Sequence, residues 1–100
     1  MISVMATLRV VPGKEKDFEK EARGMVELVG KEEGTMAYVL HRALKDPCCF
    51  VFYEKYRSRQ DLDAHASTPY FKKFFQTITP MLAGKPEIVL YEELKQAEKR

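Results

Sequence analysis

His65 is the side chain in this sequence that is best suited to proton transfer. Histidine has a usual pKa of ~6.5, close to neutral pH, so an imidazole in a dry pocket can act as a general base. Tyr56 lies earlier in the chain and could donate a hydrogen bond to the anion that forms when the base removes a proton. We therefore take His65 and Tyr56 as the candidate catalytic residues.

Aromatic side chains accompany His65 and could form the walls of a small-molecule pocket. Ligand pockets usually have mostly apolar walls with a few convergent polar groups, and an aromatic diol would fit such walls. We expect this pocket between the helices and the sheet, with further hydrogen bonds to a bound anion from the hairpin. The predicted binding residues are Tyr38, Phe52, Phe71, Phe74, Phe75, His41 and Arg42.

Each of these residues also has a purely structural interpretation. A helical histidine beside apolar residues is often held by a backbone carbonyl, and phenylalanines at helical spacing are first of all core residues. His41 could serve a dimer interface. Glu54 could pair with Arg42 or Arg57 and so join the hairpin to the helix that follows.

The sequence motifs indicate neither a metal site nor a nucleotide cofactor. The two histidines and the carboxylates do not show the spacing of known zinc ligands, and no glycine-rich phosphate loop is present. Cys48 and Cys49 are neighbours, so on a strand they point to opposite faces and cannot easily form a disulfide. We expect no cofactor, no metal, and two unpaired, buried or half-buried thiols.

The candidate residues lie in and after a predicted β-hairpin. Residues 36–44 and 48–57 alternate between apolar and polar side chains, and residues 45–47 connect the two runs. Both faces of the hairpin are largely apolar, so both need cover. Tyr38, Leu40, Arg42, Phe50, Phe52, Glu54 and Tyr56 point one way, and Val39, His41, Val51, Tyr53 and Lys55 point the other way.

The other elements are predicted from the same periodicities. A strand over residues 1–11 precedes a helix over 14–29, and a strand over 87–94 ends the fold. Ser58 should cap a short helix over 59–66, and Thr68 and Pro69 should start the next one, from Tyr70 to about residue 83. Pro80 should kink or loosen the end of that helix.

This order of elements predicts an α+β fold. Strand, helix, two strands, helix and strand form the ferredoxin-like βαββαβ arrangement, whose four-stranded antiparallel sheet has helices on one face only. Residues 1–100 should form a single domain, with a charged and frayed tail over about 95–100. The open face of the sheet would be a large apolar patch on a monomer, so we expect a homodimer through that face.

Charge and hydropathy limit the other partners. The 17 basic and 15 acidic residues are spread along the chain, so no field of one sign attracts nucleic acid. No apolar run approaches the ~20 residues that span a bilayer, and the N-terminus starts directly in a strand pattern. We therefore expect no nucleic acid and no membrane partner, and a cytoplasmic location.

The hairpin and the helix after it resemble a known family. The segment Y-x-L-H-R-x-x-x-D-P-x-x-F-V-F-Y-E-x-Y-x-S-R-x-x-L-D-x-H-x-x-T-P-x-F, from Tyr38 to Phe71, is similar to the antibiotic biosynthesis monooxygenase (ABM) domain. The family consists of small dimeric ferredoxin-like proteins, also described as dimeric α+β barrels. His65 and Phe71 stand where the family places a pocket-side histidine and an aromatic residue, and Tyr56 stands where most members have tryptophan.

The resemblance implies several possible activities. A quinol-monooxygenase-like member would oxidise a small quinol-like or polycyclic aromatic substrate with O2 and without a cofactor, with His65 as the general base. The alternatives are an isomerase of a small, possibly phosphorylated carbonyl compound, and a non-catalytic dimeric module that binds a hydrophobic ligand. The haem-degrading branch uses an asparagine, a tryptophan and a histidine where this chain has Ala6, Tyr56 and Phe75, so haem degradation is not expected.

Overall fold

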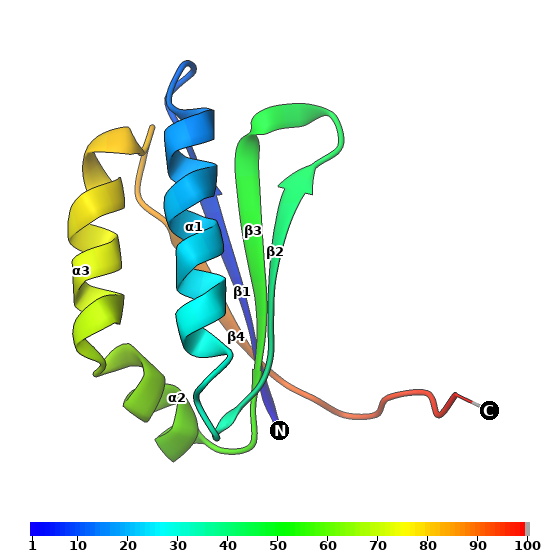
Figure 1. Cartoon of the computed structure of the whole chain (residues 1–100). Helices are drawn as coiled ribbons and strands as arrows, with labels where there is room; N and C mark the ends of the chain where they lie inside the picture. The colour runs from blue at the N-terminus through cyan, green and yellow to red at the C-terminus, as the bar shows by residue number, and fades with distance from the viewer. Residues whose placement is uncertain (100) are drawn as a thin grey trace.

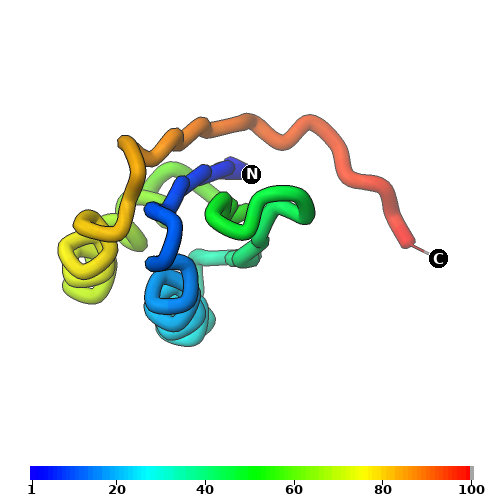
Figure 2. Tube along the Cα trace, turned by 90° about the horizontal axis from the view of Figure 1, so that it is seen from above, coloured from blue at the N-terminus to red at the C-terminus, as the bar shows by residue number. Residues whose placement is uncertain are grey.

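Four strands form one antiparallel sheet in the computed structural model, which describes residues 1–99. The strands β1 (Ile2–Arg9), β2 (Thr35–Ala43), β3 (Asp46–Tyr56) and β4 (Glu87–Glu92) lie in the order β2-β3-β1-β4 (Figure 1). The helices α1 (Glu15–Val29), α2 (Arg59–Ala66) and α3 (Pro69–Ile78) cover one face, and a 3₁₀ turn, Thr79–Met81, follows α3 (Figure 2). This arrangement confirms the predicted α+β, ferredoxin-like fold. No helix over residues 1–99 is long and apolar enough to cross a membrane.

The strand alternation places the core on the helix side of the sheet. Leu8 and Phe50 are opposite each other on β1 and β3, and both are buried. Phe18 on α1 packs against Phe50, with a distance of 4.7 Å between ring centroids, and Phe74 on α3 completes the contact between the layers. Burial of such side chains stabilises the fold by about 1.5–3 kcal/mol each.

The opposite face of the sheet is open and largely apolar. Val39, Tyr53, Met5 and Val89 form one row across all four strands. Val39, Met5 and Val89 are 43%, 37% and 46% exposed. The predicted division of the hairpin side chains between two faces is therefore correct.

Side-chain caps start α2 and α3, as predicted. The hydroxyl oxygen of Ser58 accepts a hydrogen bond from the backbone N–H of Asp61 at 3.2 Å. The hydroxyl of Thr68 accepts one from the N–H of Phe71 at 3.2 Å and donates one to the carbonyl of His65 at 2.9 Å. Thr68 therefore joins the end of α2 to the start of α3, where two of the candidate site residues lie.

Some element ends differ from the prediction. The helix α3 ends at Ile78 instead of near residue 83, because Pro80 has no N–H and its ring is incompatible with the helix interior. Asp46 and Pro47 belong to β3 instead of the connection, and the carboxylate of Asp46 accepts a hydrogen bond from the N–H of Cys48. Cys48 and Cys49 are unpaired and half-buried, as expected.

The strands at the two ends of the chain are shorter than predicted. The first strand ends at Arg9, with a single bridge from Val10 to Leu82 beyond it, and the last ends at Glu92. The predicted tail, about 95–100, forms no helix or strand over residues 95–99. Its final position, 100, lies outside the described residues.

The Thr68 cap generates a stability prediction. Thr68→Ala should lower the free energy of unfolding by about 1 kcal/mol, because the first turn of α3 loses its side-chain acceptor. The control is Thr77→Ala, which removes a hydroxyl that donates to the carbonyl of Lys73 within α3. This substitution should change the free energy of unfolding by less than about 0.5 kcal/mol. Urea unfolding measures both. Equal losses for the two variants would contradict a capping role for Thr68.

Candidate functional site

A cavity of about 240 Å³ lies between the sheet and the helices α2 and α3. All four strands contribute to its walls, and the sheet side is lined by inward-facing residues such as Val4 and Leu8 of β1. The structure brings most of the predicted site residues together there. Those that line the cavity are Tyr38, Phe52, His65, Phe71, Phe74 and Phe75.

His65 projects from α2 into a group of aromatic rings. Its ring centroid lies 5.3 Å from that of Tyr38, 5.6 Å from that of Tyr56 and 5.2 Å from that of Phe71. The side chain is only 2% exposed. The cap at Ser58 and the contact from Thr68 hold both ends of the short helix that carries it.

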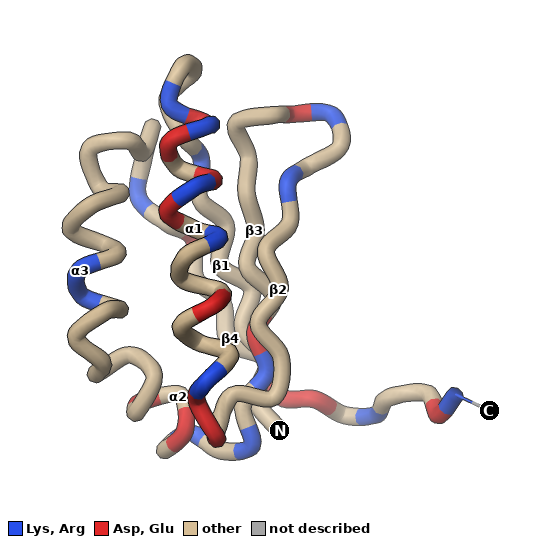
Figure 3. The backbone as a smooth tube through the Cα atoms, in the orientation of Figure 1, with Lys and Arg blue, Asp and Glu red and all other residues tan. Residues whose placement is uncertain are grey.

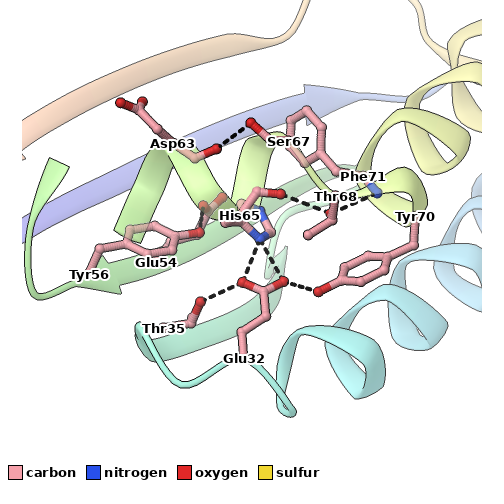
Figure 4. A network of polar contacts seen from close by, with 10 residues as sticks. All are labelled: Glu32, Thr35, Glu54, Tyr56, Asp63, His65, Ser67, Thr68, Tyr70 and Phe71. Atoms are coloured by element: carbon pink, nitrogen blue, oxygen red, sulfur yellow. Dashed lines mark hydrogen bonds and ion pairs between the residues drawn. The ribbon is translucent and has the colours of Figure 1, made fainter. Parts of the chain in front are cut away.

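Glu32, in the turn between α1 and β2, holds the imidazole from one side. Both of its carboxylate oxygens lie 3.1 Å from Nδ1 of His65 (Figure 4). Thr35 donates a hydrogen bond to the same carboxylate at 2.8 Å, and the hydroxyl of Tyr70 donates another. Burial alone would raise the pKa of Glu32, but the hydrogen bonds from Tyr70, His65 and Thr35 outweigh it and lower the pKa below its usual value.

These contacts determine which imidazole nitrogen is available. An ionised carboxylate can only accept hydrogen bonds, so Nδ1 of His65 must carry the proton that it shares with Glu32. In the neutral ring, Nε2 then has a free lone pair. Nε2 is buried and has no hydrogen-bond partner among residues 1–99. A proton acceptor with a defined orientation is therefore held in a residue that lines a mostly apolar cavity.

Glu54 is a second carboxyl group on the wall of the cavity. It is 7% exposed, and the hydroxyl of Tyr56 donates a hydrogen bond to its Oε1 at 2.7 Å. Burial raises the pKa of Glu54 to about 7, although the bond from Tyr56 opposes this rise; the negative charge of Glu32 adds to it. The carboxyl group therefore titrates near neutral pH.

The structure corrects two expectations about these β3 residues. Glu54 pairs with neither Arg42 nor Arg57, because it faces the core, whereas Arg57 lies 3.5 Å from Asp61. Tyr56 is completely buried and does not line the cavity. Its hydroxyl donates a hydrogen bond to Glu54 and does not face the cavity as a direct donor, which is where the prediction placed it.

His41 and Arg42 do not reach the cavity either, contrary to the prediction. His41 is exposed because its strand position faces the open side of the sheet, opposite Val51. Arg42 points to the helix side, but its guanidinium is bound to Glu19 of α1 at 2.6 Å. The two residues line a separate surface hollow of about 130 Å³.

The sequence interpretation missed Glu32 and did not place Glu54 in the site. Two local features mark Glu32. An acidic residue just after a helix end is unfavourable to the helix dipole, which suggests another role. Gly34 lies so close to α2 that a Cβ there would come within 2.5 Å of the Asp61 side chain, so the glycine allows the turn to approach the helix that carries His65.

The cavity offers little to a metal ion or a phosphate group. Within residues 1–99, no group of three or more His, Cys, Asp and Glu side chains could hold a metal ion. Arg59 is the one cationic residue among the described residues that line the cavity, and its guanidinium lies 3.2 Å from the carboxylate of Asp63. The walls are otherwise apolar or carry the acidic and imidazole groups described above.

Known proteins from two bacteria are similar in sequence to most of this chain. A protein from Synechocystis, named "Uncharacterized protein sll1783", is 31% identical over 91% of this chain, which spans 62% of that relative's length. A Bacillus subtilis protein named "Putative monooxygenase YcnE" is 28% identical over 92% of this chain and 97% of its own length.

Solved structures show the same fold. One titled "Putative antibiotic biosynthesis monooxygenase from Nitrosomonas europaea" has a TM-score of 0.92 and 27% identity, over 95% of this chain and all of that one. Another of the same description, from Caulobacter crescentus, has a TM-score of 0.89 and 33% identity, over 94% of this chain and 90% of that one. The sequence model described as "Antibiotic biosynthesis monooxygenase" matches residues 1–77. The chain therefore belongs to the antibiotic biosynthesis monooxygenase family.

Proposed function

We propose that this protein is a cofactor-independent monooxygenase that oxidises a small quinol-like aromatic compound with O2. The observation that carries the proposal is the buried Nε2 of His65, which has no hydrogen-bond partner among residues 1–99 and belongs to a ring that is oriented by Glu32 and lines a mostly apolar cavity. An electron-rich phenol that loses a proton to such a base becomes a phenolate, which can give an electron to O2. The family to which the chain belongs supports this reaction class.

The reaction balances without an external reductant. His65 takes a hydroxyl proton, and the phenolate transfers one electron to O2, which gives a semiquinone and superoxide. These two radicals combine at a ring carbon, so that a C–O bond forms and a peroxide results. The O–O bond and the C–H bond of the oxygenated ring carbon then break. One oxygen atom stays on the ring of a hydroxyquinone, and the other leaves as water with two of the three hydrogens that the two hydroxyl groups and this carbon release.

The size and charge of the cavity favour this substrate class over the alternatives. An apolar cavity of ~150 Å³ can hold benzene, so about 240 Å³ suits a substituted single ring better than a polycyclic compound. A phosphorylated carbonyl compound, the substrate of the isomerase alternative, would meet Glu54 and an arginine already bound to Asp63. The wall chemistry therefore suits a neutral aromatic compound.

We also propose that the protein acts as a homodimer through the open face of the sheet. The row of Val39, Tyr53, Met5 and Val89 crosses that face, and three of its members are more than a third exposed. Figure 3 shows that charged residues are concentrated on α1 and at the ends of strands, while the middle of the sheet carries few. A second copy packed on this face would remove the apolar row from water.

His65 is the first residue to test. His65→Ala should lower the rate of O2 uptake with small hydroquinones by about 10²–10⁴-fold, because a positioned base contributes that much. An oxygen electrode in metal-free buffer measures the rate. His41→Ala is the matched control. It removes the other histidine of the chain, which lies outside the cavity, and should leave the rate unchanged. His65→Gln keeps more of the buried volume if the alanine variant unfolds.

The possible outcomes separate the three functions. Equal rates for wild type and the His65 variants would remove His65 from the mechanism. Absence of O2 uptake by the wild type would overturn the monooxygenase proposal. Exchange of a substrate C–H proton in heavy water without O2 uptake would then support the isomerase, and binding without turnover or exchange would support the ligand-binding module.

Glu32 should act through the tautomer of His65. Glu32→Gln keeps the shape of the side chain, but its amide can donate to Nδ1 and so allow the proton to move to Nε2. We expect kcat for O2 uptake to fall by at least about tenfold with little change in KM, because Glu32 does not line the cavity. Glu33→Gln, at the exposed next position, should leave kcat unchanged. An unchanged kcat in the Glu32 variant would contradict this role.

The dimer proposal predicts the effect of a charge on the open face. Val39→Glu or Val51→Glu should shift the protein from dimer to monomer in analytical ultracentrifugation, because the carboxylate would be buried between two copies. Leu44→Glu places the same charge in the fully exposed hairpin turn and should leave the dimer intact. A dimer that survives both valine substitutions would show that the interface lies elsewhere.

A further inference from the structure

Glu54 has no assigned role in the reaction described above, yet it occupies a reactive position. It lies on the inner face of β3 between Phe52 and Tyr56, and it lines the same cavity as His65. Tyr56 is its one hydrogen-bond partner among residues 1–99, through Oε1. A buried carboxyl group with one neutral donor is incompletely satisfied, and a ligand in the cavity could supply a further hydrogen bond.

Residues of β1, β2 and α2 surround the carboxyl group of Glu54. On the neighbouring strands, Tyr38 of β2 and Val4 of β1 are its register partners. Figure 4 shows Glu54 and Tyr56 together on β3, with His65 of α2 beside them and Glu32 beyond the imidazole. The charged residues of α2 that line the cavity are Arg59 and Asp63, which bind each other. No cation of the described residues is therefore paired with Glu54.

We propose that Glu54, positioned by Tyr56, is a second hydrogen-bond and proton acceptor for the ligand, so that the cavity selects neutral aromatic compounds with two hydroxyl groups. One hydroxyl would bind Nε2 of His65 and the other the carboxyl group of Glu54. This inference rests on the proposed function and assigns the residue that binds the second hydroxyl group of its substrate. It makes Glu54 a specificity-determining residue and Tyr56 a positioning residue.

The balance of the reaction calls for two acceptors. Both hydroxyl protons of a quinol and the hydrogen on the oxygenated ring carbon are released when the ring becomes a hydroxyquinone. Two of these three hydrogens leave in the water molecule, and the third ends on the new hydroxyl group. His65 can hold one of these protons while O2 is reduced. A carboxyl group that titrates near neutral pH can accept the second and return it to the departing oxygen.

Anaerobic binding tests the proposal without turnover. Isothermal titration calorimetry at pH 8 would compare hydroquinone with 4-methoxyphenol, which has the same ring but only one hydroxyl group. Wild type should bind hydroquinone about tenfold more tightly or better, the effect of a hydrogen bond to a charged group. Glu54→Gln should reduce this preference to about threefold or less, whereas Glu92→Gln, at an exposed position at the end of β4 that does not line the cavity, should keep it.

The pH dependence of binding and a double variant provide two further tests of the role of Glu54. In wild type the preference for hydroquinone should decrease at pH 6, where Glu54 is protonated and is a weaker acceptor, whereas in Glu54→Gln it should not change between pH 8 and pH 6. If Glu54→Gln does not fold, Glu54→Leu combined with Tyr56→Phe replaces both members of the buried pair by apolar groups, which is often tolerated, and should also lose the preference.

The outcomes distinguish this inference from the proposed function. A preference for hydroquinone that persists in the Glu54 variants would overturn the role of Glu54 and leave the oxygenase proposal intact. A wild type that shows the Glu54-dependent preference but consumes no O2 would support this inference and overturn the oxygenase. A wild type that binds the two compounds equally, or binds neither, would overturn this inference.

Discussion

The carboxylate of Glu32 joins parts of the chain that are far apart in sequence. It lies in the turn after α1 and accepts hydrogen bonds from Thr35 at the start of β2, His65 on α2 and Tyr70 on α3. A half-buried carboxylate is costly unless donors surround it, so these contacts fix where α2 and α3 lie relative to the end of α1. The orientation of the imidazole and the free Nε2 both follow from this one group.

Two carboxyl groups with unlike surroundings determine the chemistry that the cavity can perform. Glu32 has three donors and a lowered pKa, so it stays ionised and serves the imidazole. Glu54 has one donor and mostly apolar neighbours, and its pKa is raised to about 7. Environments that separate the pKa values of nearby groups are the usual means by which proteins assign proton-transfer roles. The sheet achieves this because an inward strand position can carry Glu54 within an otherwise apolar face.

Local sequence features predicted most of the fold. The capping residues Ser58 and Thr68 and the alternation along the strands depend on neighbouring residues only, and they predicted the helix starts and the two faces of the sheet correctly. Pro80 predicted a disturbed helix end, although the α-helix stops sooner than expected. The aromatic walls of the cavity and the position of His65 were also predicted, because they depend on which face of a helix or strand a residue occupies.

Interactions between distant residues could not be predicted in this way. The sequence by itself determined the α+β fold, the open apolar face and the histidine that enters the cavity, since these follow from periodicity and turn chemistry. Only the tertiary structure showed three pairings between side chains. Glu32 binds the imidazole of His65, the hydroxyl of Tyr56 donates a hydrogen bond to Glu54, and Arg42 forms an ion pair with Glu19. Each of these pairings depends on how a turn, a helix and a strand pack together, and several carboxylates in the chain could have satisfied the same donors. The choice among them is made by distance and burial in the folded chain.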